Sequence, residues 1–327
     1  MPERIIAPKI QRGNTIRVIA PSFSASIFKP DLLHSAAATL QQMGLSTTYG
    51  NHSQEIDQFR SSSIESRVAD IHAAFEDPDV NGIISVIGGW SANQLLQYLN
   101  YDLIRANPKM FCGFSDVDAL NNAIQAKTGL ITYSGPHHIF FGQERDFEYT
   151  KKHFEKAVMG SSPFKLEPSK QWSDDDWTTE QQKRNFIPNE GLVVIQDGSA
   201  EGKVVGGNLC TLNLLQGTEY MPQLDDVILF LEEAKFSLLG QIDRDLQSLV
   251  QSKGFKPKGL VFGRFQPNTI SISELFEILR TKKEFKNIPI IANADFGHTD
   301  PKGTIPLGGT AKIVASKDGS LIEFIEH

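Results

Sequence analysis

The sequence predicts an α/β protein with two domains, in which parallel strands carry helices on both faces. Its 327 residues suggest about two domains. In the first half, short apolar runs alternate with amphipathic segments, which is typical of parallel strand–helix units. A polar stretch at 167–191 interrupts this pattern, and a second α/β region with more strand character follows. We therefore expect a domain at 1–166, a linker or substrate loop at 167–191 and a second domain at 192–327.

The first domain is expected to alternate strands with helices. Apolar runs that end in glycine, proline or serine predict strands at 15–22, 81–89, 109–114 and 130–135. The amphipathic segments between them predict helices at 30–43, 62–76, 91–99 and 116–129. We expect Ser62 and Glu65 to form a capping box on the second of these helices, and Gly129 to end the last one.

The second domain begins again with apolar runs after the polar stretch. These runs predict strands at 192–198, 201–209, 225–233, 258–265 and 288–298, with two shorter strands at 310–316 and 320–326. Helical periodicity is found around 238–252 and near 272–283. The excess of strands over helices distinguishes this half from the first.

Composition narrows the class of protein. The net charge of −7 lacks the basic character expected of a nucleic-acid binder, so we expect no nucleic-acid partner. Cys112 and Cys210 are too few for a disulfide framework, which favours reduced thiols. The first residues lack a secretory h-region, and no apolar run approaches the ~20 residues of a membrane span. We therefore expect a soluble cytoplasmic protein with no membrane association.

The junction Gly113-Phe114-Ser115-Asp116 is the first candidate for chemistry. It places a serine between an expected strand and an expected helix, at the sheet edge where α/β proteins bind ligands. A tight strand–turn–helix elbow exposes such a hydroxyl beside the unpaired N–H groups of a helix start. The second glycine of the G-x-S-x-G elbow is missing. The alternative is that Ser115 only caps the helix.

A serine nucleophile needs a base, and the base needs an orienting acid. His298 follows an apolar strand and lies between Gly297 and Pro301, while the alternative for it is a simple turn histidine. Glu232 and Glu233 end another apolar strand, where a buried carboxylate would need a partner. The alternative is that this pair is the solvated end of the strand, and alternation cannot choose between them. His137 and His138 follow a further strand end and could line the site.

Two glycine pairs lie at strand ends. Gly88 and Gly89 leave room for close approach of another group, so the N–H of Gly89 could form an oxyanion hole with that of Asp116. The turn 206–208 (Gly-Gly-Asn) is the second such pair.

These motifs together resemble the LD-carboxypeptidase family of serine peptidases. The resemblance rests on their shared order along nearly the whole chain: Ile87-Gly88-Gly89-Trp90-Ser91-Ala92-Asn93, Gly113-Phe114-Ser115-Asp116, Gly206-Gly207-Asn208-Leu209, Phe230-Leu231-Glu232-Glu233 and Asp295-Phe296-Gly297-His298. Three segments, 88–93 and 172–177 with their tryptophans and 296–301 (Phe-Gly-His-Thr-Asp-Pro), are more similar to the microcin C immunity branch than to the murein-recycling branch.

The resemblance implies a fold and a catalytic set. The fold would be an N-terminal flavodoxin-like, doubly wound domain followed by a C-terminal swivelling β/α domain, with the site between them. Ser115 would be the nucleophile, His298 the base and Glu232 the orienting acid, with oxyanion donors at Gly89 and Asp116. The enzyme would be a homodimer that needs no metal and no cofactor.

The microcin branch further implies hydrolysis of aminoacyl sulfamoyl or phosphoramidate adenylates, a small-molecule or peptide–nucleotide class of substrate. The candidate substrate-binding residues are Gly88, Trp90, Trp172, Trp177, Arg184 and Asn208. The tryptophans of the 172–177 segment would stack on the nucleobase, or one of them would pack the loop onto the body. Arg184 would bind polar substrate groups, or carry a solvated loop charge.

Three rival functions remain open at this point. A murein LD-carboxypeptidase would remove the terminal D-alanine of L,D-tetrapeptides, but a peptide needs no stacking platform. An amidotransferase-like enzyme would use Cys112, which instead is expected to point into the sheet. A non-catalytic nucleotide-binding protein would share the doubly wound fold, and fold alone does not decide between binding and catalysis.

Overall fold

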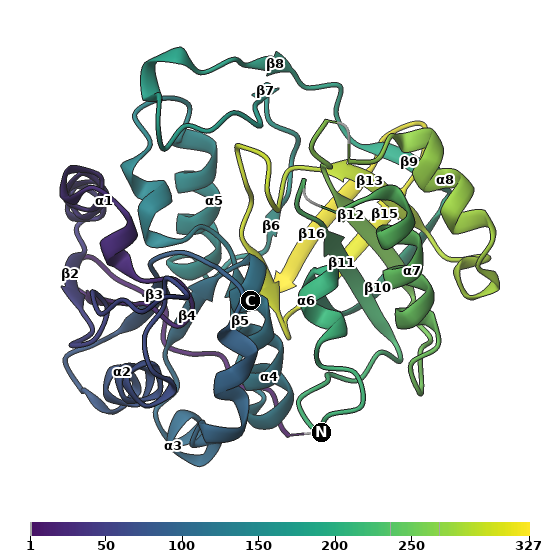
Figure 1. Cartoon of the computed structure of the whole chain (residues 1–327). Helices are drawn as coiled ribbons and strands as arrows, with labels where there is room; N and C mark the ends of the chain where they lie inside the picture. The colour runs from purple at the N-terminus through teal and green to yellow at the C-terminus, as the bar shows by residue number, and fades with distance from the viewer. Residues whose placement is uncertain (1, 236, 268) are drawn as a thin grey trace.

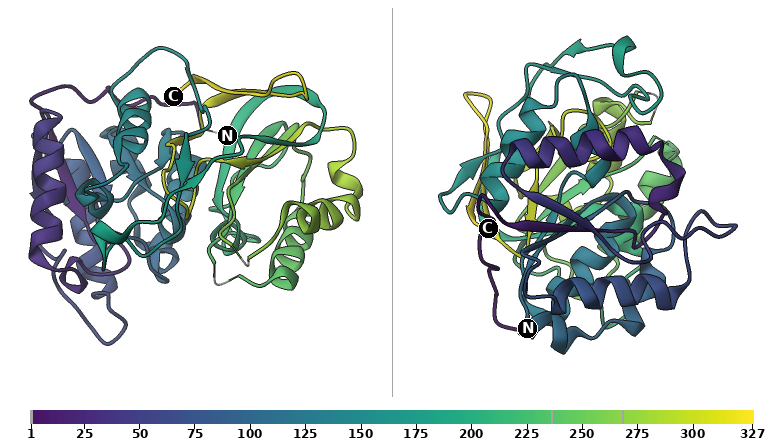
Figure 2. Two further views of the ribbon diagram at one scale, coloured as in Figure 1. Left: turned by 90° about the horizontal axis from the view of Figure 1, so that it is seen from above. Right: turned by 90° about the vertical axis from the view of Figure 1, so that its left-hand side faces the viewer.

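The computed structural model describes residues 2–235, 237–267 and 269–327, and it has two lobes, each built around a sheet. Figure 2 shows the lobes side by side, the purple and blue N-terminal lobe next to the green and yellow C-terminal lobe. The chain is therefore the two-part α/β protein that its sequence predicts. Among the described residues, no helix combines the length and the apolar character of a membrane span.

The first sheet has the strand order β14-β5-β4-β3-β1-β2. Its strands are β1 (Thr15–Ile19), β2 (Ser46–Tyr49), β3 (Gly82–Ser85), β4 (Met110–Gly113) and β5 (Thr132–Ser134), all parallel, and the antiparallel β14 (Ile305–Leu307). The helices of this lobe are α1 (Pro30–Gln42), α2 (Ile64–Glu76), α3 (Tyr101–Ala106), α4 (Asp118–Thr128) and α5 (Glu148–Val158). Parallel strands joined through helices give the doubly wound arrangement (Figure 1).

Helices cover both faces of this sheet because successive strand residues point to opposite sides. Ile84 packs in one apolar cluster with residues of α1 and α5, and its neighbour Ile83 packs in another with residues of α2, α3 and α4. The central strands β3 and β4 are buried on both faces, which explains why their sequences are not alternating, whereas the edge strand β2 is polar and partly exposed.

The second sheet has the order β6-β16-β15-β10-β11-β12-β13-β9. Four strands at its centre are parallel: β10 (Gly198–Asn208), β11 (Val227–Glu232), β12 (Gly259–Gly263) and β13 (Ile290–Ala294). Antiparallel strands extend it: β6 (Phe164–Lys165), β9 (Val193–Gln196), β15 (Thr310–Ala315) and β16 (Leu321–Glu326). The helices are α6 (Leu209–Asn213), α7 (Leu239–Val250) and α8 (Ile272–Arg280), with α7 and α8 at the edge of the lobe in Figure 1.

The two lobes exchange strands, which the sequence analysis did not anticipate. β6 leaves the first half to pair with β16, and β14 returns from the second half to pair with β5. The polar stretch between the lobes forms a two-stranded sheet of β7 (Gln171–Trp172) and β8 (Ile187–Pro188), at the top of Figure 1.

Some local expectations were wrong. The segment expected as a helix at 91–99 is a 3₁₀ helix (Ala92–Tyr98), and α3, expected nowhere, follows it. The helix start expected from a capping box of Ser62 and Glu65 was placed one residue too early. The N-cap of helix α2 is Ser63, the last extended residue before the helix, and its hydroxyl accepts a hydrogen bond from Ser66 N. The other 3₁₀ segments are Ala25–Ile27, Ser115–Val117, His138–Gly142, Gln181–Lys183 and Lys283–Phe285. Gly129 does end α4, in the left-handed region at φ 82°.

Candidate active site

The site is assembled from the carboxyl ends of strands in both sheets. Ser115 comes two residues after β4, Glu232 is the last residue of β11, and His298 follows β13 by four residues. The three side chains come from different strand ends, up to 183 residues apart in the chain, yet they are hydrogen-bonded in a row. This edge is where open α/β sheets bind their ligands.

Ser115 lies at a strained elbow. Phe114 is extended, Ser115 has φ 61°, and the chain enters a 3₁₀ turn that leads into α4. Gly113 is needed beneath the elbow, because a Cβ there would lie 2.2 Å from Ser85 Oγ. The left-handed conformation is costly for serine, and such strain is typical of functional turns. The elbow therefore forms without the second glycine of the usual motif.

This strain predicts a stability difference between two variants at position 115. Ser115→Gly and Ser115→Ala both lose the hydroxyl, but only glycine adopts a φ of 61° without a Cβ penalty. We therefore expect Ser115→Gly to be the more stable variant, with a free energy of unfolding about 1 kcal/mol larger than that of Ser115→Ala. Urea denaturation of the two variants measures the difference, and equal stabilities would show that the elbow is not strained.

His298 connects the serine to the acid. Its Nε2 lies 3.0 Å from Ser115 Oγ, and its Nδ1 lies 2.6 Å from Glu232 Oε2. The Glu232 side chain is 3% exposed and that of His298 is 21% exposed, so the carboxylate is buried while the imidazole borders solvent. In the neutral imidazole, Nδ1–H donates to the carboxylate and Nε2 is free to accept the serine proton.

Two opposing effects set the pKa of His298. Burial disfavours the imidazolium, but the charge of Glu232 and its hydrogen bond outweigh burial, and Glu233 adds to them. The ammonium of Lys302 acts in the opposite direction. The net effect raises the pKa of His298 above its ordinary value of 6.5, so His298 is a stronger base than a free imidazole.

Glu232 and Glu233 make different contacts in the structure, which alternation could not predict. Glu232 faces His298, whereas Glu233 Oε2 accepts a hydrogen bond from Cys210 N at 3.0 Å. Asn208 joins the pair, because its Nδ2 donates to Oε1 of each carboxylate at 3.0 Å. Asn208, a candidate for substrate binding, is thus buried behind the acid in this structure.

The loop that carries the glycine pair is fastened to the elbow by Asp116. The carboxylate of Asp116 accepts hydrogen bonds from Ser91 N and Ala92 N, both at 2.8 Å, and from Ser22 Oγ at 2.5 Å. A Cβ on Gly89 would lie 2.2 Å from Ser22 Oγ, and one on Gly88 would lie 3.3 Å from Ser115 Cβ.

The oxyanion donors expected at Gly89 and Asp116 stay a prediction. Gly88 lies directly against Ser115, whereas Gly89 lies against Ser22 and Phe23. Asp116 belongs to the first turn after the elbow, where N–H groups lack partners within the helix.

Of the two adjacent histidines, only His137 borders the site. Its Nδ1 lies 2.6 Å from Ser85 Oγ, and its ring stacks on Phe114 at 4.5 Å between centroids. Phe114 in turn packs against His298 at 5.2 Å. Burial holds the pKa of His137 well below its usual range, so this ring is neutral. His138 packs against Tyr49 instead.

The three tryptophans occupy different environments. Trp177 is 4% exposed and packs against Phe140 at 5.3 Å, which is the packing role left open by the sequence. Trp172 is half-buried, with the Arg264 guanidinium 5.0 Å from its ring centre. Trp90 is 74% exposed beside the glycine pair. The rings of Trp90 and Trp172 are therefore more accessible than that of Trp177.

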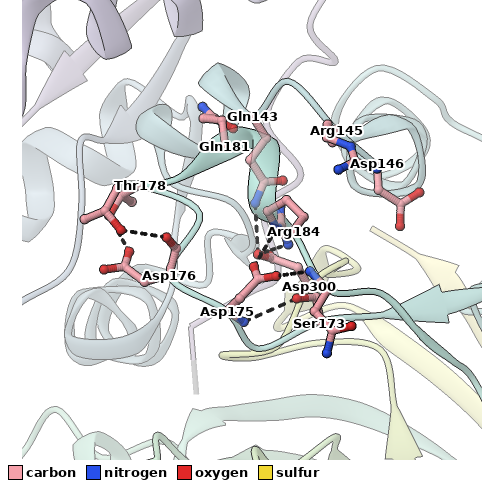
Figure 3. Close-up of polar contacts among 12 residues, drawn as sticks. Gln143, Arg145, Asp146, Ser173, Asp175, Asp176, Thr178, Gln181, Arg184 and Asp300 are labelled. Carbon is pink, nitrogen blue, oxygen red and sulfur yellow. Dashed lines mark hydrogen bonds and ion pairs between the residues drawn. The ribbon is translucent and has the colours of Figure 1, made fainter.

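Arg184 is not a solvated loop charge. Its side chain is 1% exposed and pairs through Nε with Asp175 at 2.5 Å and through Nη2 with Asp300 at 3.3 Å (Figure 3). Its Nη1 is buried without a hydrogen-bond partner among the described residues.

Neither the cysteine alternative nor a metal site has geometric support. Cys112 is fully buried within β4, and burial raises the pKa of its thiol, so the thiolate needed for nucleophilic attack is disfavoured. In the parts of the chain that are described, no group of three or more histidine, cysteine or acidic side chains is arranged to hold a metal ion.

Sequence reasoning missed several carboxylates that support the site. Asp118 Oδ2 accepts from Asn208 N at 2.9 Å and so ties the start of α4 to the strand end behind the acid. Burial raises the pKa of Asp118 to about 7. Asp295 and Asp300 flank His298 and pair with Arg264 and Arg184. The signal was present, since a carboxylate next to an apolar strand needs a partner, but the partners are distant in sequence.

Comparison with known proteins gives consistent matches along the chain. Residues 16–135 match the family model described as the LD-carboxypeptidase N-terminal domain, and residues 201–313 match that of the LD-carboxypeptidase C-terminal domain. The putative carboxypeptidase YocD of Bacillus subtilis (strain 168) is 46% identical over 98% of this chain and 99% of its own. The microcin C7 self-immunity protein MccF of Escherichia coli is 31% identical over 99% of this chain and 96% of its own.

Solved structures agree with these matches. An MccF-like protein from Bacillus anthracis str. Ames superposes with a TM-score of 0.97 at 49% identity, covering 99% of this chain and 100% of that one. MccF in complex with aspartyl sulfamoyl adenosine superposes with a TM-score of 0.88 at 28% identity, covering 99% of each chain.

Proposed function

The chain belongs to the LD-carboxypeptidase family, and from this premise we propose that it is a serine hydrolase that cleaves aminoacyl sulfamoyl or phosphoramidate adenylates of the microcin C type. Such an activity would give self-immunity or detoxification, because it destroys inhibitors that mimic aminoacyl adenylates. Two relatives are named a putative carboxypeptidase and a microcin C7 self-immunity protein, and these names support a hydrolase of this kind.

The observation that carries the proposal is the row Glu232–His298–Ser115. Its two contacts, 2.6 Å and 3.0 Å, are within the range expected for an acid, a base and a nucleophile that act together. The row begins at a buried carboxylate and ends at a hydroxyl on an elbow. A protein that only binds nucleotides would not need a carboxylate, an imidazole and a hydroxyl hydrogen-bonded in this order.

The proposed reaction proceeds through an acyl-enzyme. Ser115 Oγ attacks the carbonyl carbon of the substrate while His298 Nε2 takes the hydroxyl proton. The resulting imidazolium is stabilised by Glu232. His298 then protonates the leaving nitrogen, the bond from carbon to nitrogen breaks, and water activated by the same imidazole releases the acyl group.

The negative charge that develops on the carbonyl oxygen needs donors. We place the N–H groups of Gly89 and Asp116 in this role, because the glycine loop and the elbow meet beside Ser115 and are fastened together by the Asp116 carboxylate. Losing one donor of this kind typically lowers kcat by about 10²–10³-fold.

The nucleotide end of the substrate is assigned from a relative. MccF has been solved with aspartyl sulfamoyl adenosine bound, and the same fold covers nearly all of this chain. Of the candidate aromatic residues, Trp172 and Trp90 have rings open enough to stack on a base, whereas Trp177 would have to leave its contact with Phe140. Gly88 lines the side next to Ser115.

A murein LD-carboxypeptidase is the second candidate, because the matching family models are described as LD-carboxypeptidase domains. The same row of residues would cleave a peptide bond to a terminal D-alanine. A non-catalytic nucleotide-binding protein is the third reading, and it leaves the hydrogen-bonded row without a purpose.

Parallel incubations distinguish these functions. Purified protein would be incubated with aspartyl sulfamoyl adenosine and with a murein L,D-tetrapeptide, and mass spectrometry would follow the products. We expect cleavage of the adenylate analogue. Cleavage of the tetrapeptide alone would move the protein to murein recycling, and binding without product from either compound would leave a binding protein.

The raised pKa of His298 predicts a pH dependence. Catalysis requires the neutral imidazole, so kcat/KM falls as the pH drops through the pKa of His298 in the free enzyme. Because Glu232 and Glu233 outweigh burial and Lys302, the midpoint of this acid limb should lie above 6.5. A kcat/KM profile between pH 5 and pH 9 measures it, and a midpoint below 6.5 would contradict the electrostatic account.

We also propose that the enzyme is a cytoplasmic homodimer. The support is the resemblance to the LD-carboxypeptidase family. Light scattering on the purified protein at several concentrations tests the oligomeric state, and a monomer at micromolar concentration would contradict it.

A further inference from the structure

The segment that carries His298 is bound on both sides to the loop that links the lobes. Asp295 lies three residues before His298, and Asp300 lies two residues after it. Asp295 pairs with Arg264 at 3.0 Å and accepts hydrogen bonds from Ser169 N at 2.6 Å and Asn189 Nδ2 at 2.9 Å. One end of the segment is thus attached to both ends of the 167–191 loop.

The other end is attached more tightly, through Asp300. Its backbone forms an antiparallel bridge with Ser173: Ser173 N donates to Asp300 O at 2.7 Å, and Asp300 N donates to Ser173 O at 2.8 Å. Its carboxylate accepts from Gln143 Nε2 at 2.9 Å and from Arg184 Nη2 at 3.3 Å, and it also pairs with Lys302. Figure 3 shows the side chains of Gln143 and Arg184 converging on Asp300.

Arg184 is the residue that closes this network. Its Nε pairs with Asp175 at 2.5 Å, and Asp175 also accepts from Asn185 N at 2.6 Å, so one guanidinium holds the two sides of the loop together and fixes them to Asp300. Losing this buried cation would break the link between Asp175 and Asp300, although Asp300 would keep its contacts with Lys302 and Gln143. Arg184 was expected to bind substrate, but its guanidinium pairs with Asp300, in the segment that carries His298.

From this arrangement we infer that Arg184 is a positioning residue: through Asp300 it holds His298 in reach of Ser115, so that the nucleophile is active only when the 167–191 loop is docked. The inference rests on the proposed function, since it concerns the activation of Ser115. It goes beyond that function because it gives the loop a role in catalysis that is independent of substrate contact.

A small fluorophosphonate is the probe that separates positioning from substrate binding. Ser115 Oγ attacks phosphorus, the phosphorus–fluorine bond breaks, fluoride leaves, and the hydroxyl proton goes to His298. The reagent contains neither a nucleobase nor an aminoacyl group, so a residue that only binds substrate has no effect on the labelling rate.

We expect Arg184→Gln to label at Ser115 about 10²-fold more slowly than the unaltered protein, as for a catalytic group displaced by ~1 Å. The pH midpoint of labelling should also fall toward 6.5, because a displaced imidazole loses contact with Glu232. The other groups that act on the charge of His298, namely Glu233, Lys302 and the neutral His137, remain in place. A merely structural role would not move this midpoint.

Arg145→Gln is the matched control. Arg145 is an exposed arginine that packs, as Arg184 does, against the Phe186 ring, and it donates to Gln182 O at 3.1 Å, but Figure 3 shows it apart from Asp300. Its labelling rate should equal that of the unaltered protein. Asp300→Asn keeps the backbone bridge and should slow labelling as Arg184→Gln does, with no further loss in the double variant, because contacting residues act as one unit.

Each result has a definite meaning. Circular dichroism establishes that each variant is folded, and Arg184→Lys, which keeps the charge but not both contacts, replaces Arg184→Gln if the latter unfolds. Normal labelling of the folded arginine variant, with only KM raised, would overturn the inference and leave the proposed function intact. Failure of the unaltered protein to label at Ser115 would overturn the proposed nucleophile and the inference with it.

Discussion

Replacing Ser115 by alanine is expected to lower kcat by a factor on the order of 10⁶, the loss typical of a nucleophile whose triad acts as a unit. The reason is local, since His298 Nε2 would face a methyl group at the elbow and no other hydroxyl stands in the row. The remaining rate would come from the oxyanion donors and from binding alone. Turnover of aspartyl sulfamoyl adenosine, followed by mass spectrometry, measures the change.

The fold should survive this substitution. Ser115 is half-buried, and its hydroxyl lies at the border of the site. Because Ser115→Ala removes only this hydroxyl, the variant should bind the adenylate analogue with nearly unaltered affinity. Calorimetric titration provides this control. A variant that binds and still turns over at the original rate would remove Ser115 from the mechanism.

Replacing Glu232 by glutamine should lower kcat by about 10⁴-fold, the cost of holding a catalytic histidine in the wrong tautomer. Asn208 Nδ2 donates to Glu232 Oε1, so the glutamine must present its oxygen to Asn208 and its amide nitrogen to His298. An amide N–H donating to Nδ1 places the imidazole proton on Nε2, where it points at Ser115. The base is then unable to accept the serine proton.

The same variant changes the pH profile in a stated direction. Without the Glu232 carboxylate, burial and Lys302 dominate, so the pKa of His298 should fall and the acid limb of the residual kcat/KM should move to lower pH. Glu233→Gln is the comparison, because Glu233 faces Cys210 and does not contact the imidazole. A larger loss in Glu233→Gln than in Glu232→Gln would reverse the assignment of the acid.

The parallel strands and the place of Ser115 could be predicted because both depend on local pattern. Continuous apolar runs between amphipathic segments indicate strands buried on two faces, and a serine after such a run lies at the ligand-binding edge. The structure confirms the α/β architecture, with β4 ending just before Ser115. The polar stretch at 167–191 contains the small sheet of β7 and β8, and its assignment as a linker or substrate loop stays a prediction.

Other features depend on contacts that local pattern does not carry. Glu232 and Glu233 are both 3% exposed, so the alternation of buried and exposed residues gave no means of choosing the one that faces His298. β14 is only three residues long and joins the first sheet from the far end of the chain. Arg184 and Asp300 pair across 116 residues, and a buried ion pair has the same sequence appearance as two solvated charges.

Aromatic residues illustrate the same limit. The sequence favoured the 172–177 segment as a stacking platform, but it could not show which ring is covered. Trp177 is packed on Phe140, and Trp172 shares its surface with Arg264, because the loop folds onto both lobes. Which ring is accessible for the proposed stacking on a nucleobase is therefore decided by tertiary packing rather than by spacing.

The central claim is that Ser115 becomes acylated during turnover, and acid quenching of the reaction with aspartyl sulfamoyl adenosine tests it most directly. Proteolysis and mass spectrometry of the quenched protein locate the covalent adduct. The account predicts an aspartyl ester on the peptide that contains Ser115, and none in Ser115→Ala. An adduct on another residue, or full turnover by Ser115→Ala, would contradict it.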